Sequence, residues 1–65
     1  MKMVIYKNTT FNEICVTPRQ NYYSYVQNAN AVQRFPASDW TEDEVINYLC
    51  KYSRCTVNDF EHPAY

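Results

Sequence analysis

Apolar and polar positions near the start of the chain predict a β-hairpin. Residues 3–6 (MVIY) form a short apolar run typical of a buried strand, and residues 13–17 (EICVT) alternate so that Ile14 and Val16 share one face. The polar residues between the two runs predict a turn. Pro18 is expected to end the second strand, because proline has no backbone N–H to donate to a sheet.

The middle of the chain predicts a second hairpin. Residues 22–27 (YYSYVQ) are rich in side chains that favour strands, residues 28–30 (NAN) predict a turn, and residues 31–35 (AVQRF) predict a returning strand that ends before Pro36. The chain contains no glycine, so turns that need a positive φ are expected at asparagine, which tolerates the left-handed region well.

The pattern changes to helical spacing after Asp39. Thr41 followed by Glu44 is typical of a capping box, and Trp40 with Val45 is typical of a hydrophobic staple. We expect a helix over residues 42–53, since apolar residues recur there at helical spacing. Its expected buried stripe consists of Val45, Ile46, Leu49 and Cys50, flanked by Tyr48 and Tyr52.

Residues 55–60 (CTVNDF) predict a closing strand with Val57 directed inward and a strand end or bulge near Asn58. Together these elements predict an α+β fold in the order β-β-β(-β)-α-β. It would hold a small antiparallel sheet of three to five strands, crossed by one amphipathic helix. We expect a single domain over residues 1–65, with residues 62–65 as a loose tail.

Size and charge narrow the partners to be considered. A chain of 65 residues hides only about 60% of its unfolded surface, so its stability margin is thin and a homodimer, though not required, would add buried surface. The net charge is −1, and the six basic residues are scattered without a run. Proteins that track a phosphate backbone concentrate positive charge, so we do not expect direct nucleic-acid binding.

The acids at the helix start (Asp39, Glu42, Asp43 and Glu44) raise the question of whether they imitate a phosphate backbone. Negative charge in a first helical turn is favourable, by about 0.3–1 kcal/mol per residue, because it faces exposed backbone N–H groups. Mimicry of DNA would need acids over a whole surface, and the chain has seven Asp and Glu in total. The sequence therefore favours helix capping for this cluster.

Cysteine and histidine could together form a zinc site. Cys50, Cys55 and His62 follow a C-x4-C-x6-H spacing, with Cys15 as a conceivable fourth ligand, but this spacing departs from common zinc motifs. We expect no metal site and no cofactor, with the cysteines acting as small apolar side chains. A Cys50–Cys55 disulfide is geometrically allowed, although reduced thiols are expected without a secretory leader.

Catalytic motifs are missing from the sequence. It has no nucleophile-elbow or P-loop pattern, and its single histidine, His62, lies beside a proline. We therefore expect no catalytic residues and a protein that is not an enzyme. The apolar run at the N-terminus is too short for a signal peptide or a membrane span, so we expect no membrane partner.

Tyrosines supply the candidate binding site. Tyr22, Tyr23 and Tyr25 cannot all face a core if they lie on one strand, because neighbouring side chains alternate between the faces. Tyrosine, tryptophan and arginine are enriched at interface hot spots. The expected contact surface consists of Tyr22, Tyr23, Tyr25, Arg19, Arg34 and Trp40. The competing interpretation is ordinary sheet packing of half-buried tyrosines.

Residues 34–61 resemble a helix–strand segment of small phage-encoded proteins. The matching residues are Phe35, Pro36, Ser38, Trp40, Thr41, Glu44, Leu49, Val57, Phe60 and Glu61. The sequence departs from that pattern at residues 52–54, where a glycine would be expected. No catalytic residue transfers with this resemblance, which concerns capping and core packing.

The resemblance implies a phage anti-defence protein acting in the host cytoplasm. The leading hypothesis is a non-enzymatic inhibitor that binds a host protein or protein complex through a Tyr/Trp/Arg surface. The alternative is a homo-oligomeric sponge that sequesters a nucleotide-derived immune signal, with the rings stacking on the base and Arg19 or Arg34 contacting the phosphate. A third hypothesis is an assembly module with no soluble ligand.

Overall fold

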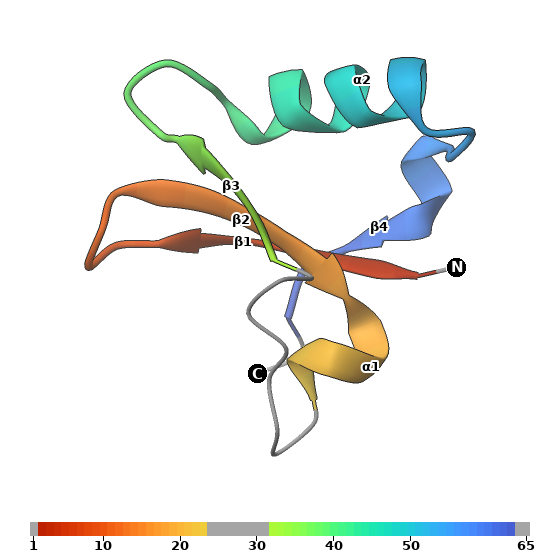
Figure 1. The fold of residues 1–65 in the computed structure, drawn as a ribbon, viewed down its shortest axis with the longest axis horizontal. Helices are drawn as coiled ribbons and strands as arrows, with labels where there is room; N and C mark the ends of the chain where they lie inside the picture. Colours follow the sequence, from red (N-terminus) through yellow and green to blue (C-terminus); the bar gives the residue numbers. More distant parts are fainter. Residues whose placement is uncertain (1, 24–31, 64–65) are drawn as a thin grey trace.

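The computed structural model describes residues 2–23 and 32–63. Among these residues one sheet forms, with strand order β3-β2-β1-β4, and the helices α1 and α2 lie on opposite sides of it (Figure 1). The elements are β1 (Met3–Asn8), β2 (Glu13–Pro18), α1 (Arg19–Tyr22), β3 (Gln33–Pro36), α2 (Glu42–Tyr52), the 3-10 helix η2 (Val57–Asp59) and β4 (Phe60–Glu61). The predicted α+β class, with a small sheet and one main helix, is confirmed.

The predicted first hairpin is confirmed, and asparagine shapes its turn. β1 and β2 pair antiparallel from Met3 opposite Pro18 to Asn8 opposite Glu13. The side chain of Asn8 accepts a hydrogen bond from the backbone N–H of Thr10 at 3.1 Å. Asn12 has φ of 52°, so asparagine takes the left-handed position that glycine often fills.

Directly opposed residues of paired strands point to the same face, so the register separates two layers. Ile5 lies opposite Val16, and both pack against α2. Tyr6 lies opposite Cys15 on the other face, where α1 packs on β1 and β2. The core beneath α2 consists of Ile5, Ile14, Val16, Val45 and Leu49.

α2 begins as predicted. The Thr41 hydroxyl accepts a hydrogen bond from the Glu44 backbone N–H at 3.2 Å, and the Glu44 carboxylate accepts one from the Thr41 N–H at 3.1 Å. Val45 and Leu49 are buried, and Trp40 and Ile46 pack against the same cluster. The helix ends at Tyr52, one residue before the predicted end.

The closing segment differs from the prediction. Residues 57–59 form a 3-10 helix instead of a strand, and Val57 is 62% exposed instead of directed inward. The cause is local: the Asp59 carboxylate accepts a hydrogen bond from the Thr56 N–H at 2.9 Å, which turns the backbone. Only Phe60–Glu61 extend as β4, which pairs parallel to β1, so the sheet is mixed while the other two strand pairs are antiparallel.

The first strand of the predicted second hairpin is wrong where the structure describes it. Tyr22 ends helix α1 and Tyr23 follows in a turn, so these two residues are not part of a strand. The predicted turn and the remainder of that strand lie outside the described residues, as does Tyr25. The predicted returning strand is present as β3, and its partner is β2, with Ile14 opposite Phe35.

Candidate functional site

The structure describes five of the six predicted binding residues and divides them between the two layers; Tyr25 lies outside the described residues. Arg19 and Tyr22 belong to α1, and Tyr23 follows it. Arg34 lies opposite Cys15 in the β2–β3 register, which places it on the α1 face. Trp40 packs beneath α2 on the other face, so the five described residues do not form one continuous Tyr/Trp/Arg surface.

α1 is fixed to the sheet by backbone and aromatic contacts. The Arg19 backbone N–H donates to the Lys2 carbonyl at 3.0 Å, and the Tyr23 N–H donates to the Arg19 carbonyl at 3.2 Å. The Tyr22 ring lies 5.1 Å from the Tyr6 ring, centroid to centroid, and 5.0 Å from the Tyr23 ring in an edge-on arrangement. These distances are in the favourable range for aromatic pairs, so Tyr22 anchors the helix and supports Tyr23 from one side.

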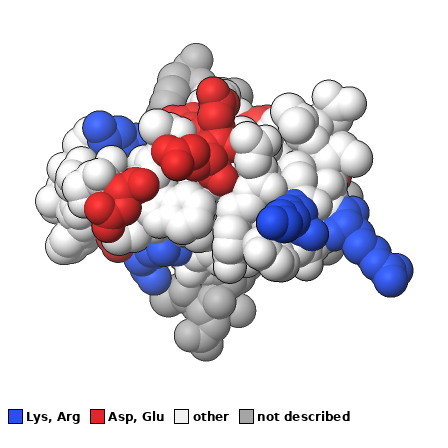
Figure 2. All heavy atoms as spheres, turned by 90° about the horizontal axis from the view of Figure 1, so that it is seen from above, with Lys and Arg blue, Asp and Glu red and all other residues white. Residues whose placement is uncertain are grey.

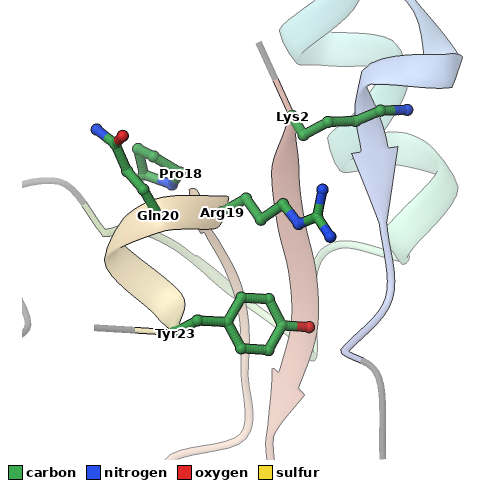
Figure 3. A pocket seen from close by; sticks show the side chains of 5 residues that line it. All are labelled: Lys2, Pro18, Arg19, Gln20 and Tyr23. Carbon is green, nitrogen blue, oxygen red and sulfur yellow. The ribbon is translucent and has the colours of Figure 1, made fainter. Parts of the chain in front are cut away.

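A pocket opens beside this helix, with a volume of about 430 Å³. Its lining consists of Lys2, Pro18, Arg19, Gln20 and Tyr23. The side chains of Lys2, Arg19 and Tyr23 extend towards the same side in Figure 3. The Tyr23 side chain is 50% exposed. We call this feature the α1 pocket; it combines two cationic groups with one aromatic ring.

Both cations of the α1 pocket are oriented by the C-terminal segment. Lys2 Nζ donates to the Asn58 carbonyl at 2.6 Å. Arg19 Nε lies 3.2 Å from Glu61 Oε1, and this pair uses one of the three nitrogens of the guanidinium group. Ion pairs of this exposed kind add little stability, but they restrict where the two side chains can lie.

Asp59 adds a negative charge near Lys2. The hydrogen bond from the Thr56 backbone N–H lowers the pKa of Asp59 below its usual range, and the charge of Lys2 lowers it further. The carboxylate is therefore ionised at neutral pH. Because Asp59 and Glu61 both lie near the cations, the α1 pocket presents mixed charge instead of a purely positive surface.

A second surface, which was not predicted from the sequence, consists of Phe35, Trp40, Tyr48 and Tyr52, and we call it the aromatic row. Ring centroids lie 5.1 Å apart for Phe35 and Trp40, 5.4 Å for Trp40 and Tyr48, and 4.8 Å for Tyr48 and Tyr52. Tyr48 is 43% exposed and Tyr52 66% exposed. The signal that could have revealed the row is the four-residue spacing of Tyr48 and Tyr52, which places them on one side of a helix.

The acids at the start of α2 act locally, as predicted for Glu44. Glu44 completes the capping box, and Glu42 Oε2 lies 2.7 Å from His62 Nε2. The His62 contact attaches the first residue of the expected tail to α2, and residues 64–65 lie outside the described part of the chain. His62 thus contacts a carboxylate, not a cysteine.

The cysteines are free thiols in two different environments. Cys15 is buried on the α1 face, and burial raises the pKa of its thiol, as does the charge of Glu13. Partial burial raises the pKa of Cys50, and a hydrogen bond with Cys55 adds to this effect. Cys55 Sγ lies 3.5 Å from the Leu49 carbonyl. Within residues 2–23 and 32–63, no three His, Cys, Asp or Glu side chains are grouped so that they could hold a metal ion.

Comparison with protein-family models, with curated protein sequences and with solved structures finds no match for this chain. The resemblance of residues 34–61 to phage proteins therefore stays a prediction. Of the helices that the structure describes, none has the length and apolar character needed to cross a bilayer.

Proposed function

We propose that this chain is a small non-enzymatic binding protein that captures another protein at the α1 pocket. The observation that carries the proposal is the arrangement of Arg19 and Tyr23: a 59% exposed arginine and a 50% exposed tyrosine line one concavity. Arginine and tyrosine are among the residues that most often dominate binding energy at interfaces, especially at pockets that lose their water on binding.

The lining indicates what such a partner would present. Tyr23 and Pro18 offer apolar surface, whereas Lys2 and Arg19 offer hydrogen-bond donors at the rim. A protein loop that inserts an apolar side chain next to a carboxylate or a backbone carbonyl would match both kinds of lining. Asp59 and Glu61 would disfavour a strongly acidic segment, because like charges would then face each other.

We also propose the kind of protein that is captured. The resemblance of residues 34–61 to phage-encoded proteins favours a host protein as the target, and a bacterial defence protein or complex in the host cytoplasm in particular. Capture of this kind needs no catalytic group. It inhibits the target by covering a surface that the target needs.

The test compares two tyrosines on the two different faces. Immobilised wild-type chain, Tyr23→Ser and Tyr52→Ser would each be incubated with lysate of a bacterial host and the retained proteins identified. We expect one host protein to be retained by wild type and by Tyr52→Ser, and to be lost with Tyr23→Ser. Circular dichroism of each variant shows whether the fold is kept. Equal retention by Tyr23→Ser would overturn the proposed contact site.

The volume of the α1 pocket supports a second candidate, the nucleotide sponge. About 430 Å³ lies within the range of small-molecule sites, and Tyr23 with Arg19 could stack on a base and contact a phosphate. This candidate predicts that a panel of mono-, di- and cyclic nucleotides raises the melting temperature of wild type but not of Tyr23→Ser. If wild type retains a host protein and no nucleotide raises its melting temperature, protein capture is supported over nucleotide binding.

A further inference from the structure

One exposed flank of α2 carries a regular order of charge and aromatic side chains. Four exposed residues follow one another here at intervals of four, three and one residues along the chain, which places them along one side of the helix: Glu44, Tyr48, Lys51 and Tyr52. Figure 2 shows acidic groups over the first half of this side and basic groups beside its end. Tyr48 and Tyr52 also belong to the aromatic row, so this charged surface has an apolar centre.

Tyr48 lies between the acidic Glu44 and the basic Lys51 on this side of the helix. At a rise of about 1.5 Å per residue, Glu44 lies about 6 Å before Tyr48 along the helix axis and Lys51 about 4.5 Å after it. A twofold axis through Tyr48 would therefore bring Glu44 of one chain next to Lys51 of a second chain, twice by symmetry. A parallel arrangement would instead place like charges together.

We propose that the aromatic row is a self-association surface on which a second copy of this chain docks with its α2 antiparallel. The two Tyr48 rings meet at the centre, each Tyr52 covers the end of the opposing row, and each Glu44 pairs with the partner's Lys51. Charge complementarity decides for a second copy over an unrelated protein, because the acidic half of this surface matches its own basic half.

The size of the chain makes such pairing useful. A standard interface takes about 800 Å² from each partner, roughly a sixth of the 4915 Å² that one chain exposes. The helix side and the rings of the aromatic row form the apolar part of that area, and the charged residues form its rim. α1, whose residues line the α1 pocket, lies on the opposite side of the sheet from α2 (Figure 1), so the pocket of each copy would stay open in the dimer.

The first test measures mass against concentration. Analytical ultracentrifugation of wild type should show a rise from 7.8 kDa towards twice that value as concentration increases. Tyr48→Ser should stay at the mass of one chain over the same range, and Tyr23→Ser, altered on the other face, should pair like wild type. This control separates the dimer from the proposed partner binding: either can fail while the other holds.

The second test exchanges charges across the interface. Lys51→Glu alone and Glu44→Lys alone should each weaken pairing at least tenfold, because each places like charges opposite one another. An equimolar mixture of the two should recover dimers, since every contact in the mixed pair joins opposite charges. Glu44→Gln, which can keep the capping box, should weaken pairing without loss of helix and replaces Glu44→Lys as the single variant if that one unfolds.

Three results would overturn the proposal. The first is a wild-type mass of one chain at every concentration, which excludes a dimer. The second is an undiminished dimer in Tyr48→Ser or Lys51→Glu, which places the interface elsewhere. The third is a mixture of folded charge variants that stays monomeric, which excludes the pairing of Glu44 with Lys51.

Discussion

The two faces of the sheet are covered in different ways. On one face, α2 spans 11 residues, begins with a complete capping box, and buries Val45 and Leu49. On the other face, α1 spans four residues, has no side-chain hydrogen bond at its cap, and buries none of its own residues. Packing of an apolar stripe explains the first helix, whereas a backbone hydrogen bond to Lys2, ring contacts and the Arg19–Glu61 ion pair hold the second.

The difference separates stability from recognition. The α2 layer contains the contiguous apolar core, and burial of apolar surface is the main favourable term in folding. The α1 layer contains mixed polar and aromatic groups and the pocket we propose as a binding site. Substitutions on the two faces should therefore differ in how they affect folding and binding.

The largest effect is expected beneath α2. Ile5 is completely buried there, so Ile5→Ala removes three carbons and leaves a cavity, with an expected loss of about 2–5 kcal/mol in the free energy of unfolding. A small domain has little stability to lose, and this variant should be largely unfolded at room temperature. Urea denaturation followed by circular dichroism measures the loss. A midpoint close to that of wild type would show that the α2 layer is not the main core.

A matched pair of valines compares the two layers directly. Val16 on the α2 face and Val4 on the α1 face are both buried. Each Val→Ala change should cost about 2 kcal/mol from lost burial and the cavity left behind. We expect Val16→Ala to lose more stability than Val4→Ala. Beside Val4, a one-turn helix such as α1 can shift inward and fill the cavity. The urea midpoints of the two variants decide this, and a larger loss for Val4→Ala would reverse the ranking of the layers.

Removal of the side-chain cap of α2 should lower the free energy of unfolding by a smaller amount. Thr41→Ala removes the hydroxyl that accepts from the Glu44 N–H, with an expected loss of about 1 kcal/mol. Glu44→Gln serves as the control, because glutamine can also complete a capping box. Thermal melts of both variants make the comparison. Equal melting temperatures would mean that the hydroxyl contributes nothing to this helix.

The smallest effect is a pH dependence of the α1 layer. Burial raises the pKa of Cys15 above its ordinary value of 9.0, so the unfolded chain loses this proton first as pH rises. The stability that the protonated Cys15 thiol contributes to the folded state is fully present below pH 9.0. It is lost as pH rises through the raised pKa of this thiol in the folded chain. The decrease in urea midpoint between pH 8 and pH 10 should be smaller for Cys15→Ala than for wild type. If the urea midpoint falls equally in wild type and in Cys15→Ala, the loss of stability at alkaline pH comes from other groups.

The elements that follow from the sequence are those with local signals. The first hairpin follows from two alternating runs, and α2 follows from Thr41, Glu44 and the apolar residues at helical spacing. α1 is too short for any periodicity, so residues 19–21 were expected in a loop, and the aromatic composition of residues 22–27 led to a strand that begins at the last residue of this helix. Thr56 and Asp59 did carry a local turn signal, but the apolar Val57 between them favoured the wrong assignment.

The candidate site was harder to predict because it depends on long-range contacts. Arg19 and Tyr23 were selected by residue type, and both line the α1 pocket. Lys2 was missed, since only the pairing of β1 with its neighbours brings it beside residues 18–23. Trp40 was assigned to the same surface, although the layer to which it belongs is set by its packing on the α2 core.

The strand order has a consequence for synthesis. β1 is made early but lies inside the sheet, with β4 at its outer edge in parallel pairing. On the ribosome, the backbone of β1 therefore keeps one open edge until residues 60–61 emerge, and open edges favour pairing between chains. A nascent chain stalled before Phe60 should be prone to aggregate, so the last strand of the fold protects the first.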